Sequence, residues 1–162
     1  MLKYMLDTNI VIYVIKRRPI EVLATFNLHA GHLCISSITL AELLHGVEKS
    51  DRPEHNLRQV EDFVSRLDIL DYGSKAAEHY GNIRASLEKQ GKTIGVNDLH
   101  IAAHARSESL ILVSNNLKEF ERVEALRLDN WYNPNNCSHA PASQNAERSN
   151  MNFHGDHRNY WG

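Results

Sequence analysis

Three acidic residues lie where predicted strands end or predicted helices begin, and together they could hold a metal ion. Asp7 comes directly after the apolar run 2–6. Glu42 lies shortly after the run 33–36, and Asp98 opens a predicted helix. Mg²⁺ is usually held by one or two carboxylates together with water and a substrate phosphate. Asp7 alone is also typical of a helix N-cap, so the prediction of a small acidic metal site depends on all three residues.

The elements that must position these acids alternate between strands and helices. We expect strands at 2–6, 33–36, 68–70, 110–114 and 126–128, and helices at 10–15, 20–28, 38–48, 53–66, 75–90, from 98 onwards, and at 117–122. This alternation predicts an α/β fold with a parallel sheet and helices on both of its faces. In such a sheet, ligands bind outside the carboxyl ends of the strands, which is where Asp7 is expected.

Two of the predicted helices carry apolar stripes at helical spacing, which we expect to be buried. The stripe in 38–48 consists of Leu40, Leu43, Leu44 and Val47, and that in 53–66 of Leu57, Val60, Phe63 and Val64. Glu42 lies off the first stripe, near the start of its helix. Its carboxylate is therefore expected to face the end of the preceding strand.

The composition divides the 162 residues into a body and a tail. Residues 1–132 can form one domain with a substantial core. Residues 133–162 contain no Leu, Ile or Val, and seven of these thirty residues are Asn. Such a segment cannot bury enough apolar surface to offset its chain entropy, so we interpret it as a polar, disordered C-terminal extension.

Charge and cysteine content limit the functional classes. The formal net charge of −2 gives no overall attraction to nucleic acid, so any such binding must come from a local patch or a bridging metal. No apolar run is long enough to span a membrane, and the N-terminus lacks a signal-peptide pattern. The two cysteines, Cys34 and Cys137, do not indicate a disulfide framework, which fits a cytoplasmic protein.

Several motifs then occur in a specific order over residues 2–131. They are Met5-Leu6-Asp7-Thr8-Asn9, residues 37–42, Asp98 with 101–105, residues 112–116 with Glu119-Phe120, and Asp129-Asn130-Trp131. In this order the sequence resembles the PIN-domain ribonucleases and, more narrowly, the VapC toxins of bacterial type II toxin–antitoxin pairs.

The resemblance implies a PIN-like fold and an endoribonuclease that uses Mg²⁺ or Mn²⁺ to hydrolyse RNA phosphodiester bonds, with tRNA as the substrate. It also implies a homodimer silenced by a VapB-type antitoxin. Asp7, Glu42 and Asp98 match the acidic ligands of the family. The fourth family position is often Asp and here is Asn116, which brings no charge, so Glu119 is the nearest acid that could compensate.

Neighbouring residues have expected supporting roles. Thr8 can donate a hydrogen bond to Asp7 or to a phosphate oxygen. Asn9 can orient the metal ligands through hydrogen bonds without binding the metal itself. Ser114 ends the fourth predicted strand, two residues before Asn116. We expect the helix dipole to keep Asp98 ionised at the first turn of its helix.

Several of these residues also fit other kinds of site. His100 and His104 have zinc-ligand spacing, but Ile101 stands where a zinc protease has Glu, so packing is the expected role. Lys16-Arg17-Arg18 fits either an RNA-backbone contact or a solvated helix end. A haloacid-dehalogenase-type phosphatase would need an acid at Asn9. A non-catalytic RNA-binding or scaffolding PIN domain stays open as the alternative function.

Overall fold

The computed structural model describes residues 1–132, which form five parallel strands and the helices between them. The expected role of residues 133–162, including Cys137, lies outside the described residues. In chain order the elements are β1 (Tyr4–Leu6), α1 (Thr8–Lys16), α2 (Ile20–Leu28), β2 (Leu33–Ser36), α3 (Ser37–Glu48), α4 (Pro53–Val64), β3 (Asp68–Leu70), α5 (Ser74–Lys89), α6 (Val96–Ser107), β4 (Ile111–Val113), α7 (Leu117–Phe120) and β5 (Leu128–Asp129). The predicted α/β fold is confirmed, with small shifts at element ends.

The strand order in the sheet is β3-β2-β1-β4-β5, and every pairing is parallel. The central strand β1 therefore has β2 on one side and β4 on the other. Because all strands run in one direction, the residues that follow β1, β2 and β4 meet at the same edge. These residues include Asp7 and Ser114.

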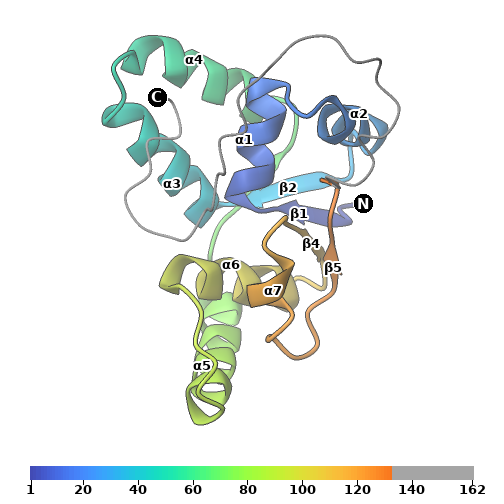
Figure 1. Ribbon diagram of the computed structural model, residues 1–162, viewed down its shortest axis with the longest axis vertical. Helices are drawn as coiled ribbons and strands as arrows, with labels where there is room; N and C mark the ends of the chain where they lie inside the picture. The colour runs from blue at the N-terminus through green and yellow to red at the C-terminus, as the bar shows by residue number, and fades with distance from the viewer. Residues whose placement is uncertain (133–162) are drawn as a thin grey trace, which may run out of the picture.

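Helices cover both faces of the sheet, with α1–α4 on one face and α5, α6 and α7 on the other (Figure 1). Alternate residues of the strands point to the two faces. Leu6 and Ile35 belong to the hydrophobic core beneath α1–α4. Met5 and Leu112 belong to the second core, beneath α5, α6 and α7. All four are fully buried, which fixes the register and thereby the place of the residues that follow each strand.

The predicted stripes of α3 and α4 are only partly buried. Leu43, Val60 and Phe63 lie in the core, but Leu44 and Leu57 are each 37 % exposed, so their predicted burial is wrong. Only one narrow side of each helix faces the core. One buried position of α4 is occupied by a polar residue, Asn56. Its side-chain amide donates a hydrogen bond to Ser50 Oγ (2.9 Å), which offsets the cost of its burial.

Two further residues of the described chain lie in its interior. Trp131 is buried beyond β5, where its ring packs edge-on against Tyr4 and stacks with His29. Cys34 is a buried free cysteine in β2. Within residues 1–132, none of the helices combines the length and apolarity that crossing a bilayer would need.

Candidate active site

Asp7 lies at the centre of the site, at the junction between β1 and α1. It is the N-cap of α1, where its Oδ1 accepts a hydrogen bond from the Thr8 backbone N–H (2.8 Å). Its Oδ2 accepts from Ser114 Oγ (2.8 Å), which follows β4. The side chain is only 4 % exposed. Asp7 therefore fills both roles considered from sequence, that of a helix cap and that of an acid at the sheet edge.

Glu42 approaches Asp7 from α3. The Thr8 hydroxyl donates to Glu42 Oε1 (3.2 Å), so Thr8 links the two acids through its backbone N–H on one side and its hydroxyl on the other. The hydroxyl was expected to bind Asp7 or a phosphate, and in this structure it binds Glu42 instead. Glu42 therefore faces the edge of the sheet, but its contact is with Thr8 after β1 and not with the end of β2, the preceding strand that was expected.

Asp98 and Glu119 complete the acidic group from the other face of the sheet. Asp98 lies in the first turn of α6, and its carboxyl interacts with Asp7, Glu119 and Glu42. Glu119, in α7, accepts a hydrogen bond from Asn116 Nδ2 (3.1 Å). The backbone N–H of Asn116 in turn donates to Ser114 Oγ (2.9 Å). The structure thus brings all of the predicted acids to one edge of the sheet.

Burial and mutual repulsion raise the pKa values of these carboxyl groups. Burial is the largest cause for Asp7, Glu42 and Asp98, and charge repulsion from neighbouring acids adds to it. The pKa of Glu42 is raised to about 7 and that of Asp98 to about 8. The expectation that the helix dipole keeps Asp98 ionised is therefore wrong, because burial and three nearby acids outweigh the dipole.

The chemistry of these side chains fits a hard divalent cation. The group offers carboxylate, amide and hydroxyl oxygens, with neither thiolate nor imidazole among them, as Mg²⁺ prefers. Burial, together with repulsion between the acids, raises the pKa values of these carboxyl groups, and a bound cation would favour their charged forms. Among residues 1–132, no group of three or more Asp, Glu, His or Cys side chains is arranged so that it could hold a metal ion in this structure.

Two asparagines that the sequence did not single out also belong to the site. Asn97, beside Asp98, forms a side-chain hydrogen bond that partly offsets the raised pKa of Glu42. Asn115 accepts from Asn9 Nδ2 (3.4 Å) and donates to Tyr13 Oη (2.9 Å). Asn9 therefore forms a hydrogen bond with the loop that follows β4, and not with one of the acids. The only signal for either residue was its position next to a predicted site residue.

The two histidines of α6 pack against neighbouring elements, as expected from the sequence. His104 is 1 % exposed, and its Nδ1 is hydrogen-bonded to Ser36 Oγ (2.8 Å) at the end of β2. The Nδ1 atom of His100 is hydrogen-bonded to Tyr72 Oη (2.8 Å). One ring nitrogen of each histidine thus has a polar neighbour, from β2 or from the segment after β3, and these contacts hold α6 against the sheet.

Sequence and structure comparisons relate this chain to known proteins. The PIN domain profile matches residues 4–126. The chain is 71 % identical over 131 residues to Ribonuclease VapC2 of Haemophilus influenzae, and 56 % identical over 131 residues to the tRNA(fMet)-specific endonuclease VapC of Shigella flexneri. Each alignment covers 81 % of this chain and 99 % of the relative.

A solved structure agrees with these relatives. The chain is similar to one in the crystal structure of DNA-bound VapBC from Salmonella typhimurium, with a TM-score of 0.79 and 52 % identity. The match covers 82 % of this chain and all of that one. With the parallel sheet and the acids at its edge, these similarities show that the chain belongs to the PIN-domain family and, within it, to the VapC ribonucleases.

Proposed function

We propose that this protein is the toxin of a VapBC-type pair and cleaves tRNA in a reaction that depends on Mg²⁺ or Mn²⁺. The observation that carries the metal dependence is the meeting of Asp7, Glu42 and Asp98 at one sheet edge, with raised pKa values that a bound cation would lower. The ribonuclease activity follows from membership of the VapC family.

Asp7, Glu42 and Asp98 would hold the cation. When bound, a divalent cation supplies an activated water and neutralises charge that develops on the phosphate. Asp7 is kept in place by Ser114 and by the Thr8 backbone N–H, so its carboxylate needs little reorganisation before binding. Glu42 is oriented by the Thr8 hydroxyl. These contacts fix the carboxyl group at the start of α1 relative to the one on α3.

Asn116 and Glu119 would act beside the ligands. The Asn116 side chain donates to Glu119, and Glu119 in turn interacts with Asp98. Glu119 thus supplies the negative charge that Asn116 lacks. With its pKa raised to about 8, the carboxyl of Asp98 holds a proton near neutral pH when no cation is present. Cation binding would release that proton.

For the substrate we propose initiator tRNA(fMet). The argument is similarity: the VapC relatives from Shigella flexneri and Salmonella typhimurium, named as tRNA(fMet)-specific endonucleases, are 56 % and 52 % identical to this chain over 131 residues. At that identity, over nearly the full length of both relatives, the same RNA is the first substrate to test.

For the partners we propose a VapB-type antitoxin and a second copy of this chain. The related structure from Salmonella typhimurium is a VapBC complex. Leu44 on α3 and Leu57 on α4 are each 37 % exposed on helices that pack together, so they offer an apolar surface for a dimer contact. Light scattering that reports only monomers would contradict the dimer.

Sequencing of RNA 5′ ends after brief expression in bacterial cells tests the proposed substrate. We expect new ends within tRNA(fMet) for the wild type and none for Asp98→Asn at equal soluble expression. Glu108→Gln, at the other end of α6, is the matched control and should behave like the wild type. New ends confined to other RNAs would contradict tRNA(fMet), and no new ends at all would favour a non-catalytic PIN domain.

A further inference from the structure

Glu42 and Asp98 interact with each other although their helices pack on opposite faces of the sheet. Leu43 of α3 lies in the core beneath α1–α4, whereas Ile101 of α6 lies in the second core. Within the described residues, Ile38 is the one apolar side chain of α3 that packs against the second core. The place of Glu42 relative to Asp98 therefore depends on how the two faces are joined at the edge of the sheet.

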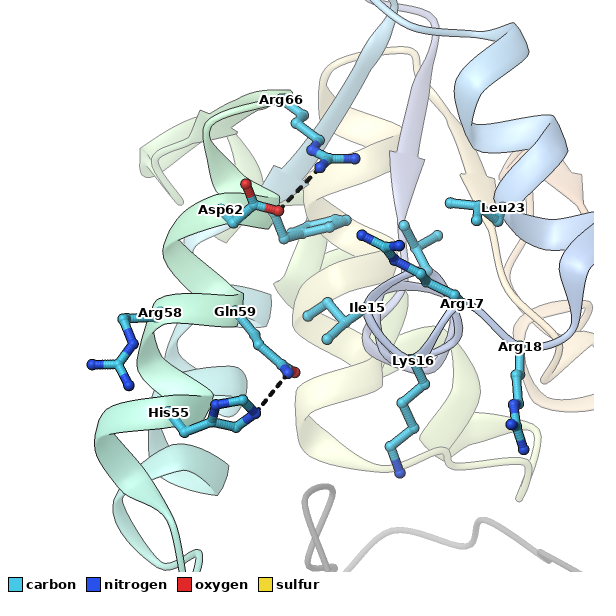
Figure 2. Close-up of a pocket in the computed structure, with 12 residues that line it drawn as sticks. Ile15, Lys16, Arg17, Arg18, Leu23, His55, Arg58, Gln59, Asp62 and Arg66 are labelled. Atoms are coloured by element: carbon cyan, nitrogen blue, oxygen red, sulfur yellow. Dashed lines mark hydrogen bonds and ion pairs between the residues drawn. The ribbon is translucent and has the colours of Figure 1, made fainter.

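Apolar packing holds α6 more completely than it holds α3. Residues 101–103 and Ala105 of α6 are fully buried. Helix α3 packs against α4, and a groove of about 810 Å³ separates part of α4 from the end of α1 (Figure 2). Ile15 of α1 and Gln59 of α4 both line this groove. Contacts other than apolar packing must therefore help to fix α3.

A buried polar link joins α6 to the start of α3. His104 is 1 % exposed, and its Nδ1 is hydrogen-bonded to Ser36 Oγ (2.8 Å). Ser36 is also the N-cap of α3, because its Oγ accepts a hydrogen bond from the Ile38 backbone N–H (3.1 Å). One hydroxyl thus ties the first turn of α3 to a side chain of α6. Burial of an imidazole costs free energy unless it is hydrogen-bonded, so packing alone would be served better by an apolar residue.

Tyr72, in the segment after β3, supports the same link. Its backbone N–H donates to the side-chain oxygen of Ser37, the first residue of α3 (3.0 Å). Its ring meets the His104 ring edge-on, with 5.5 Å between the ring centroids. Tyr72 therefore contacts both partners of the link, and the His104 ring has little freedom to turn away from Ser36.

The two acids lie at equal distances along the chain from this link. Glu42 is six residues after Ser36, and Asp98 is six residues before His104. Six residues of a helix span about 9 Å. At that far end the helices meet again, through a hydrogen bond between the side chains of Asn97 and Glu42 and through the interaction of Glu42 with Asp98. A change at the link would therefore move Glu42 relative to Asp98.

We propose that His104 is a positioning residue of the acidic site. Through Ser36 it sets the place of Glu42 relative to Asp98, and thereby the affinity of the site for a divalent cation. The inference rests on the proposed function, because it takes these acids to hold the cation. His104 does not bind the cation itself, since its hydrogen-bonded nitrogen is engaged with Ser36 at the end of β2.

Two substitutions of His104 separate its hydrogen bond from its packing. His104→Leu fills most of the space of the ring without a polar atom, whereas His104→Asn keeps a polar atom at the place of Nδ1 and leaves a cavity. Mn²⁺ binding to the full chain without RNA is measured by electron paramagnetic resonance, and the melting temperature is measured in EDTA. His104→Leu should weaken Mn²⁺ binding about tenfold, the lower end of the loss caused by removing an outer partner of metal ligands. His104→Asn should bind Mn²⁺ more tightly than His104→Leu in spite of its cavity.

Ser36→Ala is the second variant, because it removes the same hydrogen bond from the other side. It should weaken Mn²⁺ binding at least as much, and His104→Leu added to it should weaken binding no further, since the two residues act through one contact. Val22→Ala, at a fully buried position of α2, is the matched control for lost stability and should bind Mn²⁺ like the wild type.

Each outcome decides the proposal. Weaker binding by His104→Leu that is recovered in His104→Asn supports it, and if His104→Leu does not fold, Ser36→Ala decides in the same way. Wild-type binding by the folded variants overturns it. Binding by His104→Asn as weak as that by His104→Leu, or a loss that follows the melting temperature in every variant including Val22→Ala, overturns it and assigns His104 to packing. Asp98→Asn separates the two levels of the account. If Asp98→Asn loses Mn²⁺ binding and His104→Leu does not, this inference alone fails, whereas a wild type that binds no Mn²⁺ ends the proposed metal dependence as well.

Discussion

Ser114 donates a hydrogen bond of 2.8 Å to the buried carboxylate of Asp7, although 107 positions separate the two residues in the sequence. The bond exists because β1 and β4 are parallel neighbours in register, with Leu6 paired to Val113. The residue that follows each strand is therefore brought to the same place. The same Ser114 oxygen accepts from the backbone N–H of Asn116, so one hydroxyl orders both Asp7 and the loop that carries Asn116.

Ser114→Ala should reduce both stability and cleavage. It leaves a buried carboxylate oxygen without its donor, which costs about 1–3 kcal/mol of the free energy of unfolding. Ser107→Ala is the matched control, because Ser107 is also buried but donates to His104 O, away from the acids. Chemical denaturation and tRNA cleavage together check the prediction. Equal activity losses in the two variants would mean that Ser114 acts through stability alone.

Asn116→Asp should increase the affinity for Mg²⁺ and destabilise the metal-free protein at pH 8. The change adds a charge and replaces a hydrogen bond to Glu119 with repulsion. The Mg²⁺ concentration for half-maximal cleavage should fall, and in EDTA the melting temperature should fall as well. Asn27→Asp, at an exposed position of α2, introduces the same charge elsewhere. A half-maximal Mg²⁺ concentration that is unchanged, or higher, would show that Asn116 does not face the cation.

The stability of the metal-free protein should decrease as pH rises. The folded pKa values of Glu42 and Asp98, about 7 and about 8, lie above their ordinary values of 4.5 and 3.8. Between these limits the folded state binds more protons than the unfolded state, so the free energy of unfolding falls as pH rises. The contribution of these two groups should therefore make the melting temperature in EDTA lower at pH 8 than at pH 5.5.

Asp98→Asn isolates this effect. His104 has a lowered pKa and contributes the opposite trend, but the variant retains it. We expect the variant to be more stable than the wild type at pH 8 and the difference to shrink towards pH 5. Thermal melts of both proteins in EDTA measure it. A difference that is constant across this range would refute the raised pKa of Asp98.

Truncation after Tyr132 should leave the melting temperature and the cleavage rate nearly unchanged. The two cores close within residues 1–132, and Trp131 is buried against Tyr4 and His29. The removed segment has no Leu, Ile or Val to add to them. Melting and tRNA cleavage by the truncated and full chains provide the comparison. A loss of several degrees, or of activity, would assign residues 133–162 a working role.

The fold and the main acids were predictable from sequence because both depend on local patterns. Alternating apolar strands and helices predict a parallel sheet, and Asp7 at the end of a strand then has a known place. Features that arise from distant segments could not be predicted. The raised pKa of Asp98 depends on its burial and on three acids from α3, α7 and the end of β1. The exposure of Leu57 depends on which side of α4 meets the core.

The central claim is that Asp7, Glu42 and Asp98 hold the cation that RNA cleavage requires. The most direct test is the initial rate of tRNA(fMet) transcript cleavage as a function of Mg²⁺ concentration, for the wild type, Asp7→Asn, Glu42→Gln, Asp98→Asn and the control Glu108→Gln. If metal positioning contributes about 4 kcal/mol, Asp7→Asn and Asp98→Asn should lose about a thousandfold in rate, and Glu42→Gln somewhat less. Wild-type rates in EDTA, or in either aspartate variant at equal folded concentration, would contradict the account.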